Sequence, residues 1–328
     1  MKCCIPNKQP WIYSLKSDIM FKFKSSALKT KEAMCKAVSG DYENNAKEKI
    51  QKLTLHNEVL FTNSGNGAIF LALSAVEKDL LIPDEGGWHG FKQIGNYLNK
   101  NITQIKTNKG LISEESLKEH NNCTLILTSF AGYTAKQDLK NISKICKENN
   151  ITLIEDASAG IGDKKREVGN GKYSDIILAS TGSPKIINVG SGGFVTTSNP
   201  HFLEKIKIPE KLTKPNEIIL AGIDSELDFV EKNLELTVNA NTYLKNNIDN
   251  VIHKEYEGLN IIIPHEHQKE FSWKLKKELV IDKKSFITTC PNYNRIKQKA
   301  IVIETKNLSY ESLTKENLDK IIEVSNQQ

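Results

Sequence analysis

The sequence predicts an α/β protein with a mostly parallel central sheet, followed by a smaller C-terminal α+β domain. In the middle of the chain, strand-like apolar runs at 102–106, Thr124–Thr128 and 151–155 accompany a helical segment at 137–149. This β-α-β order favours parallel strands with helices on both faces of the sheet. The composition changes after about Asn199, and 328 residues can bury the cores of a large and a small domain.

The elements of the large domain are predicted from hydrophobic period and turn residues. The first 41 residues have mixed polarity and no long period, so an N-terminal arm is expected at 1–41. Apolar residues recur on one helical face in the next segment, which predicts an amphipathic helix at 42–55. The further elements expected are a strand at 59–61, a helix at 66–76, and strands at Leu80–Pro83, 176–179 and Gly193–Thr197.

The C-terminal part is predicted to form a separate small domain. A polar segment with two prolines at 209–217 has the composition of a linker, and a long helix is expected at 223–248. The chain then divides into an arm at 1–41, a large domain at 42–207 and a small domain at 208–328. The small domain is expected to contain a strand at 259–263, a helix at 268–280, a strand at 299–304 and a helix at 313–324.

Composition restricts the classes of function. The charged fraction of 26% and hydrophobic fraction of 38% are typical of a soluble globular protein, and no apolar run approaches the roughly 20 residues of a membrane span. The N-terminus has no apolar signal core, so a cytoplasmic location is expected. The net charge of +5 comes from lysines dispersed among acids, which argues against nucleic acid as a partner.

The potential metal ligands do not have the spacing of a known metal site. None of the six cysteines has CxxC spacing, so free thiols are expected, while the role of the adjacent Cys3 and Cys4 stays open. His265 and His267 alternate after a predicted strand, but no third spaced ligand accompanies them. We therefore predict exposed loop histidines and no metal site.

One lysine lies on a loop between two buried strands. Lys185 follows the hydroxyls and the proline of 180–184 and precedes the glycines at 190, 192 and 193. A lysine held away from bulk water readily forms a Schiff base with an aldehyde, and small residues let a flat ligand approach the backbone. Taken alone, a lysine near glycines is more often a solvated loop lysine.

Two further stretches contain potential site residues. Asp156 comes at the C-terminal end of a predicted strand, where open α/β sheets place ligands. Ser64, Gly65 and Asn66 precede an apolar helix, whose first N–H groups could hold a phosphate. The structural alternatives are that Asp156 caps a turn and that Ser64 caps the helix. Trp88 follows a turn near these segments and is either a core aromatic or a ring that stacks on a ligand.

Along the chain, the loop at 64–66 comes first, Asp156 second and Lys185 third. In this order the segments resemble the DegT/StrS family of sugar aminotransferases, which depend on pyridoxal 5′-phosphate (PLP). The resemblance extends from residue 5 to residue 227 and includes the segments IPNKQPWI, IPDEGGWHG and KREVGNGKYSD and the serine–lysine–glycine loop. It implies the three-layer PLP-dependent transferase fold (fold type I). It also implies PLP as the cofactor.

The resemblance assigns roles to particular residues. Lys185 would form the Schiff base and transfer the proton, and Asp156 would pair with the ring nitrogen, so that the ring can accept carbanion electrons. Trp88 would stack on the ring. The remaining cofactor contacts, to the phosphate, would come from Ser180 and the Ser64, Gly65 and Asn66 loop.

The implied activity is transfer of an amino group from an amino acid, typically glutamate, to a keto-sugar, which in the family is attached to a nucleotide. Several positions depart from the family pattern. Ala159 replaces a glutamine, Ser191 replaces a glutamate, the 129–133 segment lacks a histidine, and Asn216 is a loose match. Two alternatives therefore stay open: another PLP reaction, such as elimination, sulfur transfer or cofactor-precursor chemistry, or a non-catalytic PLP-fold binding protein. The substrate-binding residues are not identified.

The arm has more apolar surface than a free tail should expose. It must bury that surface against its own large domain or against a second chain. The resemblance implies the second arrangement, a homodimer with shared active sites. The apolar residues concerned are Trp11, Ile12, Tyr13, Ile19, Met20, Phe21 and Phe23.

Overall fold

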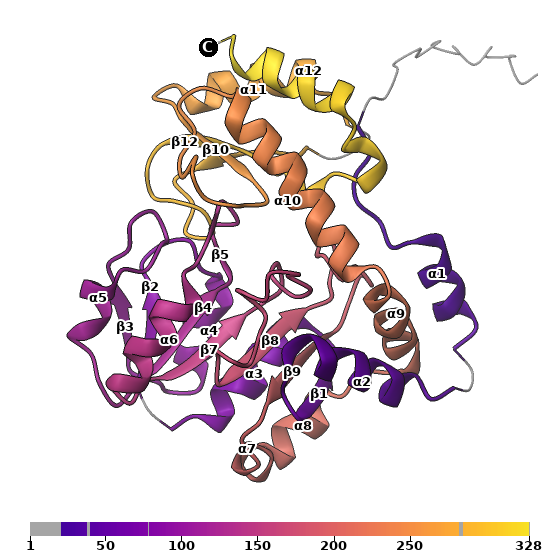
Figure 1. Ribbon diagram of the computed structural model, residues 1–328, viewed down its shortest axis with the longest axis vertical. Helices are drawn as coiled ribbons and strands as arrows, with labels where there is room; N and C mark the ends of the chain where they lie inside the picture. The colour runs from indigo at the N-terminus through magenta and orange to yellow at the C-terminus, as the bar shows by residue number, and fades with distance from the viewer. Residues whose placement is uncertain (1–20, 38–39, 78, 282–284, 328) are drawn as a thin grey trace, which may run out of the picture.

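The computed structural model describes residues 21–37, 40–77, 79–281 and 285–327 (Figure 1). Most of the predicted arm lies outside these residues. The arm residues concerned are Cys3, Cys4, Trp11, Ile12, Tyr13, Ile19 and Met20.

A seven-stranded sheet forms the centre of the protein, in the order β1-β9-β8-β7-β4-β2-β3. β9 pairs antiparallel with β1 and with β8, whereas every other neighbouring pair in this sheet is parallel. The prediction of a mostly parallel central sheet is confirmed. The strands are β1 (Glu58–Thr62), β2 (Leu80–Pro83), β3 (Ile102–Ile105), β4 (Thr124–Thr128), β7 (Thr152–Asp156), β8 (Ile176–Ser180) and β9 (Gly193–Thr197).

Helices cover both faces of this sheet and give three layers (Figure 1). Successive side chains of a strand point to opposite faces, so Leu153 and Ile154 of β7 join different hydrophobic cores. The first core contains residues of α2 (Tyr42–Thr54), α5 (Glu114–Lys118) and α6 (Leu139–Glu148). The second contains residues of α3 (Gly65–Ala75), α4 (His89–Tyr97) and α7 (His201–Lys205).

The C-terminal part contains an antiparallel sheet in the order β10-β12-β11, with a hydrophobic core of its own. Figure 1 shows this part above the end of the large sheet, and the long helix α10 runs diagonally down from it. Its elements are α10 (Val230–Asn247), β10 (Ile261–Pro264), α11 (Gln268–Glu278), β11 (Ile287–Cys290), β12 (Ala300–Ile303), η1 (Thr305–Asn307), η2 (Tyr310–Ser312) and α12 (Lys315–Ser325).

Two predictions about the start of this part are wrong. The expected linker at 209–217 contains α8 (Lys207–Thr213), because Pro209 lies in the first turn of the helix, where a missing N–H is tolerated. The expected helix at 223–248 is two helices, α9 (Glu217–Leu227) and α10. The chain turns between them through a tight bond from the Phe229 N–H to the Glu226 carbonyl, 3.0 Å long. Strand β11 was not predicted.

The described end of the arm packs against the chain's own C-terminal part. Phe21 is fully buried in that core, with its ring centroid 5.2 Å from the ring of Phe286, and Phe23 bridges to Leu308. We expected burial against the large domain or a second chain, so for these two residues the expectation is corrected. Later in the same arm, α1 (Leu28–Cys35) lies against α9.

Among the described residues, Cys35, Cys146 and Cys290 are free thiols. No group of three or more metal-ligating side chains is found within them, and His265 stacks on Phe271. No helix in the described part of the chain is both long and apolar enough to cross a membrane.

Candidate active site

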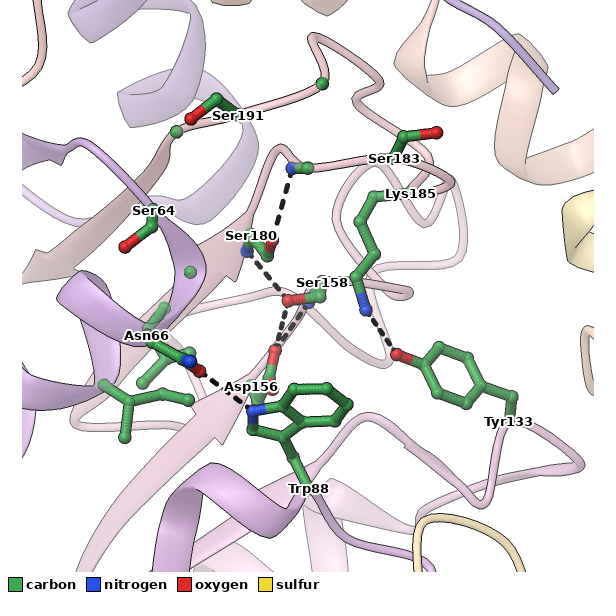
Figure 2. A pocket seen from close by; sticks show the side chains of 16 residues that line it. Ser64, Asn66, Trp88, Tyr133, Asp156, Ser158, Ser180, Ser183, Lys185 and Ser191 are labelled. Carbon is green, nitrogen blue, oxygen red and sulfur yellow. Dashed lines mark hydrogen bonds between the residues drawn. The ribbon is translucent and has the colours of Figure 1, made fainter. Parts of the chain in front are cut away.

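The predicted site residues line one cavity of about 300 Å³ at the carboxyl ends of β7 and β8 (Figure 2). Parallel strands end at the same edge of the sheet, and the N-terminus of α3 closes one side of this space. The predicted residues that line it are Ser64, Gly65, Asn66, Trp88, Asp156, Ser180 and Lys185. The sequence did not identify Tyr133, Ser158 and Ser183 as further lining residues.

Asp156 is the last residue of β7, and its carboxylate is buried and fixed. Its Oδ1 accepts hydrogen bonds from the Ser158 N–H at 3.0 Å and from the Ser158 hydroxyl. The Ser180 N–H donates to that hydroxyl at 2.8 Å, so β8 also holds the carboxylate in place. The expected turn cap therefore exists, but it uses Oδ1. Among the described residues no bond to Oδ2 is found, and this oxygen can bind a ligand.

Lys185 lies on the loop after β8 and is partly buried. Its Nζ is 2.5 Å from the hydroxyl of Tyr133 and 5.9 Å from the centre of the Trp88 ring system (Figure 2). Burial would lower the pKa of Lys185, but the neighbouring Tyr133 and Asp156 outweigh burial and raise it. Burial raises the pKa of Asp156, and the Lys185 charge opposes this. The lysine therefore lies in an electrostatic field that favours its ammonium form.

The N-terminus of α3 lies very close to the segment that carries Ser180. Ser64 caps the helix by accepting a bond from the Gly67 N–H at 3.0 Å, so its hydroxyl has the structural role considered above. A Cβ on Gly65 would lie 2.4 Å from the Cβ of Ser180, so only glycine lets the two segments meet. The first N–H groups of a helix lack partners within the helix, and here the first residues of α3 line the same cavity as Ser180.

Trp88 is not a core residue. It precedes α4, and 37% of its surface is exposed. The indole Nε1 donates to Asn66 Oδ1 at 3.0 Å, which fixes the ring plane at the wall of the cavity (Figure 2). An exposed aromatic ring held by a hydrogen bond is suited to stack on a flat ligand. Asn66, expected to act through its backbone, thus also positions Trp88 with its side chain.

Ser158 and Tyr133 have only weak sequence patterns that would indicate a place in the cavity. Ser158 stands two residues after Asp156, a spacing at which aspartate commonly bonds the backbone, and this pattern could have found it. Tyr133 lies in the turn between β5 (Phe130–Ala131) and β6 (Ala135–Lys136), far along the chain from Lys185. No local pattern in the sequence connects the two.

The model of the DegT/DnrJ/EryC1/StrS aminotransferase family matches residues 24–217. The chain belongs to this family. The rest of the chain matches a different model, the MJ1341 family C-terminal domain, over residues 231–326.

Two curated relatives from Campylobacter jejuni strains are each a UDP-4-amino-4,6-dideoxy-N-acetyl-beta-L-altrosamine transaminase. One is 35% identical over 107 residues, which cover 31% of this chain and 28% of the relative. The other is 32% identical over 158 residues, which cover 48% of this chain and 36% of the relative. The aligned segments thus span little more than a third of these relatives at most.

Solved structures share the fold over nearly the whole chain. The Helicobacter pylori aminotransferase PseC, involved in pseudoaminic acid biosynthesis, has a TM-score of 0.73 at 15% identity, covering 93% of this chain and 100% of that one. The 3-amino-5-hydroxybenzoic acid synthase has a TM-score of 0.70 at 14% identity, covering 93% and 99%. Sphingomonas wittichii serine palmitoyltransferase has a TM-score of 0.72 at 12% identity, covering 93% and 86%. The predicted three-layer fold type I is confirmed.

Proposed function

We propose that this protein is a PLP-dependent aminotransferase that moves an amino group from an amino-acid donor, such as glutamate, to a keto-sugar. One observation carries the proposal: Lys185, Asp156 and Trp88 converge on a cavity whose other end is the N-terminus of α3. Membership of the aminotransferase family supports the reaction class, and the two transaminase relatives support a sugar as acceptor.

The residues present fit the cofactor. Lys185 would bind the aldehyde, Oδ2 of Asp156 would face the ring nitrogen, and Trp88 would cover one face of the ring. The phosphate would be held by the Ser180 hydroxyl and by the first N–H groups of α3. The aldehyde, the ring nitrogen, the ring face and the phosphate would each meet a matching group, and the glycine at position 65 leaves room at the phosphate end.

When bound, PLP supplies an electron sink for a carbanion at the substrate. The protein's own groups do the rest. The Asp156 carboxylate, fixed by Ser158, would keep a proton on the ring nitrogen of the bound cofactor. The Nζ of Lys185 is the base that takes and holds the proton from the donor's α-carbon. The cavity wall formed by Trp88 excludes water from one side of the reacting atoms.

A different PLP reaction, such as an elimination, is the second candidate. The observation that favours it is the C-terminal part, which matches a model other than that of the aminotransferase family. Ala159, in the position of the family's glutamine, and Ser191, in that of its glutamate, point the same way. In the family pattern the glutamine contacts the region of the cofactor's phenolic oxygen, so Ala159 removes one cofactor contact, whereas Lys185, Asp156, Trp88 and Ser180 remain.

The test is cofactor binding followed by a single turnover. With PLP, the protein should develop a visible absorption band, and borohydride followed by peptide mapping should locate the label on Lys185. Lys185→Ala should lose the band, whereas Lys24→Met, at a buried lysine that does not line the cavity, should keep it. A label elsewhere or no band overturns the cofactor assignment. Pyridoxamine phosphate after addition of glutamate supports transamination, and its absence with every amino donor favours the second candidate.

The protein is further proposed to be a homodimer. Around α3, large apolar side chains of α4 and α8 face solvent in the single chain: Tyr97 is 78% exposed, Ile208 73% and Leu212 70%. The same helix α8 ends at Thr213, whose carbonyl accepts a bond from the Asn63 N–H beside the cavity. A partner on this surface would therefore lie next to the site. Light scattering should give twice the chain mass of 36.9 kDa, and a mass near 36.9 kDa with PLP present ends this proposal.

A cytoplasmic location is also proposed. The free cysteines of the described part of the chain persist most readily in a reducing compartment.

A further inference from the structure

Tyr133 is surrounded by three cations. Its hydroxyl is 2.5 Å from the Nζ of Lys185, and its ring centre is 4.8 Å from the guanidinium carbon of Arg295 and 4.8 Å from the Nζ of Lys306. Lys185 comes from the large sheet, whereas Arg295 and Lys306 come from the C-terminal part. The phenol thus connects the predicted catalytic lysine with charges from the other part of the chain.

The backbone holds Tyr133 firmly in this place. Its φ of 63° lies in the left-handed region, which a tyrosine adopts only when its surroundings impose it. The surroundings are two amides of the segment entering β10: the N–H groups of Leu259 and Asn260 donate to the Tyr133 carbonyl at 2.8 and 3.0 Å. The C-terminal part therefore fixes the backbone from which the phenol extends.

The two outer cations are themselves fixed. Arg295 forms a forked pair with Glu304, with Nη2 to Oε1 at 2.7 Å, Nη2 to Oε2 at 2.8 Å and Nε to Oε1 at 3.0 Å. Lys306 Nζ is 3.3 Å from Glu304 Oε2. All three side chains are largely buried, so their charges act on Tyr133 through a medium that screens them little.

The charges around the phenol do not cancel without it. Arg295, Lys306 and Lys185 contribute three positive charges, and Glu304 and Asp156 contribute two negative ones, which leaves one positive charge in excess. A phenolate on Tyr133 removes the excess. Burial would raise the pKa of Tyr133, but Lys185, Lys306 and Arg295 outweigh burial and bring it below the usual value of 10.0. Burial lowers the pKa of Lys306, and Glu304 opposes this.

We propose that Tyr133 is the proton partner of Lys185, and that Arg295 and Lys306 hold its phenolate form. The step is balanced: the phenolate oxygen accepts one proton from the Lys185 ammonium, which leaves a neutral amine and a neutral phenol, and the reverse transfer restores the pair. The neutral amine is the form that attacks an aldehyde or accepts a proton from carbon. The inference rests on the proposed role of Lys185, and it makes the C-terminal part a determinant of that lysine's basicity.

The first test uses the full-length protein without cofactor. Tyrosinate absorbance, followed against pH, should show one tyrosine ionising before the others. Tyr133→Phe should remove this early step. Tyr310→Phe should keep it, because Tyr310 also lies under a lysine, with Lys24 Nζ 4.5 Å from its ring centre, yet burial raises its pKa. Lys306→Met should move the early step to higher pH. The proposal is overturned if the early ionisation step persists in Tyr133→Phe, or if its pH is the same in Lys306→Met as in the wild type.

The second test measures Lys185 itself. The rate at which an amine-reactive reagent labels Lys185, resolved by peptide mapping against pH, reports its pKa. In Tyr133→Phe the midpoint should move to lower pH, because the ammonium loses its counterion while Arg295 and Lys306 remain. An unchanged midpoint refutes the partnership. If PLP does not bind, the proposed function is refuted, but both measurements on the protein without cofactor can still be made. Failure of the proposed function and failure of the Tyr133–Lys185 partnership are therefore distinguishable.

Discussion

Replacing Glu304 with glutamine removes the negative charge that holds Arg295 and Lys306 in the interior. Glu304 is 3% exposed and accepts three hydrogen bonds from Arg295. Glutamine has almost the same volume, so the change creates no cavity; it removes the charge and places a donating NH2 where an oxygen accepts hydrogen bonds. The two cations would then lie buried beside Tyr133 without their carboxylate.

The magnitude follows from the pKa of Glu304. Burial would raise this pKa, but Lys306 and Arg295 lower it from 4.5 to about 2. At about 1.4 kcal/mol per pKa unit, the charged form contributes about 3 kcal/mol to the free energy of unfolding. Breaking a buried ion pair from one side costs about 3–5 kcal/mol, in agreement. Because the folded-state pKa is depressed, this contribution is present above pH 4.5 and is lost as the pH falls toward 2.

The assay is urea unfolding followed by circular dichroism at a series of pH values. At pH 7, Glu304→Gln should be about 3 kcal/mol less stable than the wild type, and the difference should shrink as the pH falls below 4.5. Glu266→Gln is the matched control, because Glu266 pairs with Lys299 at 3.0 Å on the surface, and it should show no measurable change. Equal stability at pH 7, or a difference that does not depend on pH, would refute the reasoning.

Four further predictions concern single positions. Asp156→Ala should lose PLP-dependent turnover while its thermal midpoint changes little; a variant that loses about 0.5–2 kcal/mol of stability and stays active would indicate a turn cap only. Gly65→Ala should weaken PLP binding, measured by titrating the visible band, because the new Cβ would lie 2.4 Å from that of Ser180; unchanged affinity contradicts this. Lys24→Met should be more stable than wild type at pH 7, and less so as the pH rises toward 10.5, because burial lowers the pKa of Lys24 to about 7. Burial also lowers the pKa of Lys245 to about 7, but its Nζ donates to three carbonyls that Lys245→Met would leave unpaired, so this variant should be less stable than wild type, and chemical denaturation compares the two variants.

The sheet was predictable where local signals agreed. β2, β4 and β9 have the predicted bounds, because each is a short apolar run bounded by turn residues. The break between α9 and α10 was not predictable from the sequence, because neither glycine nor proline marks it and the chain turns through a backbone bond at Phe229. β11 was missed because its two central threonines are only partly buried, so the run lacks an apolar signal.

The site was likewise predictable only where its residues have a local sequence signal. Asp156, Lys185 and the loop before α3 each occur at the end of a strand, and the topology alone brings such ends together. Tyr133 comes from a turn, Arg295 from a loop and Lys306 from the short helix η1, and these segments meet only in the folded chain. A sequence pattern records neither that meeting nor the excess of positive charge that it creates.

The pairing of Arg295 also bears on how an amino donor would bind. Arginine is the usual bidentate partner of a carboxylate, and the sequence has only two, Arg166 and Arg295. Arg295 directs its Nε and Nη2 to Glu304 and one Nη1 hydrogen to the Asn294 carbonyl, so its fork is already occupied. Arg166 is exposed, and no guanidinium lines the described cavity. A donor carboxylate would therefore have to be held by hydroxyls and backbone amides of the cavity, by a lysine, or by Arg166 of a second chain. Only the last of these requires the dimer, so donor affinity in Arg166→Ala connects the two proposals.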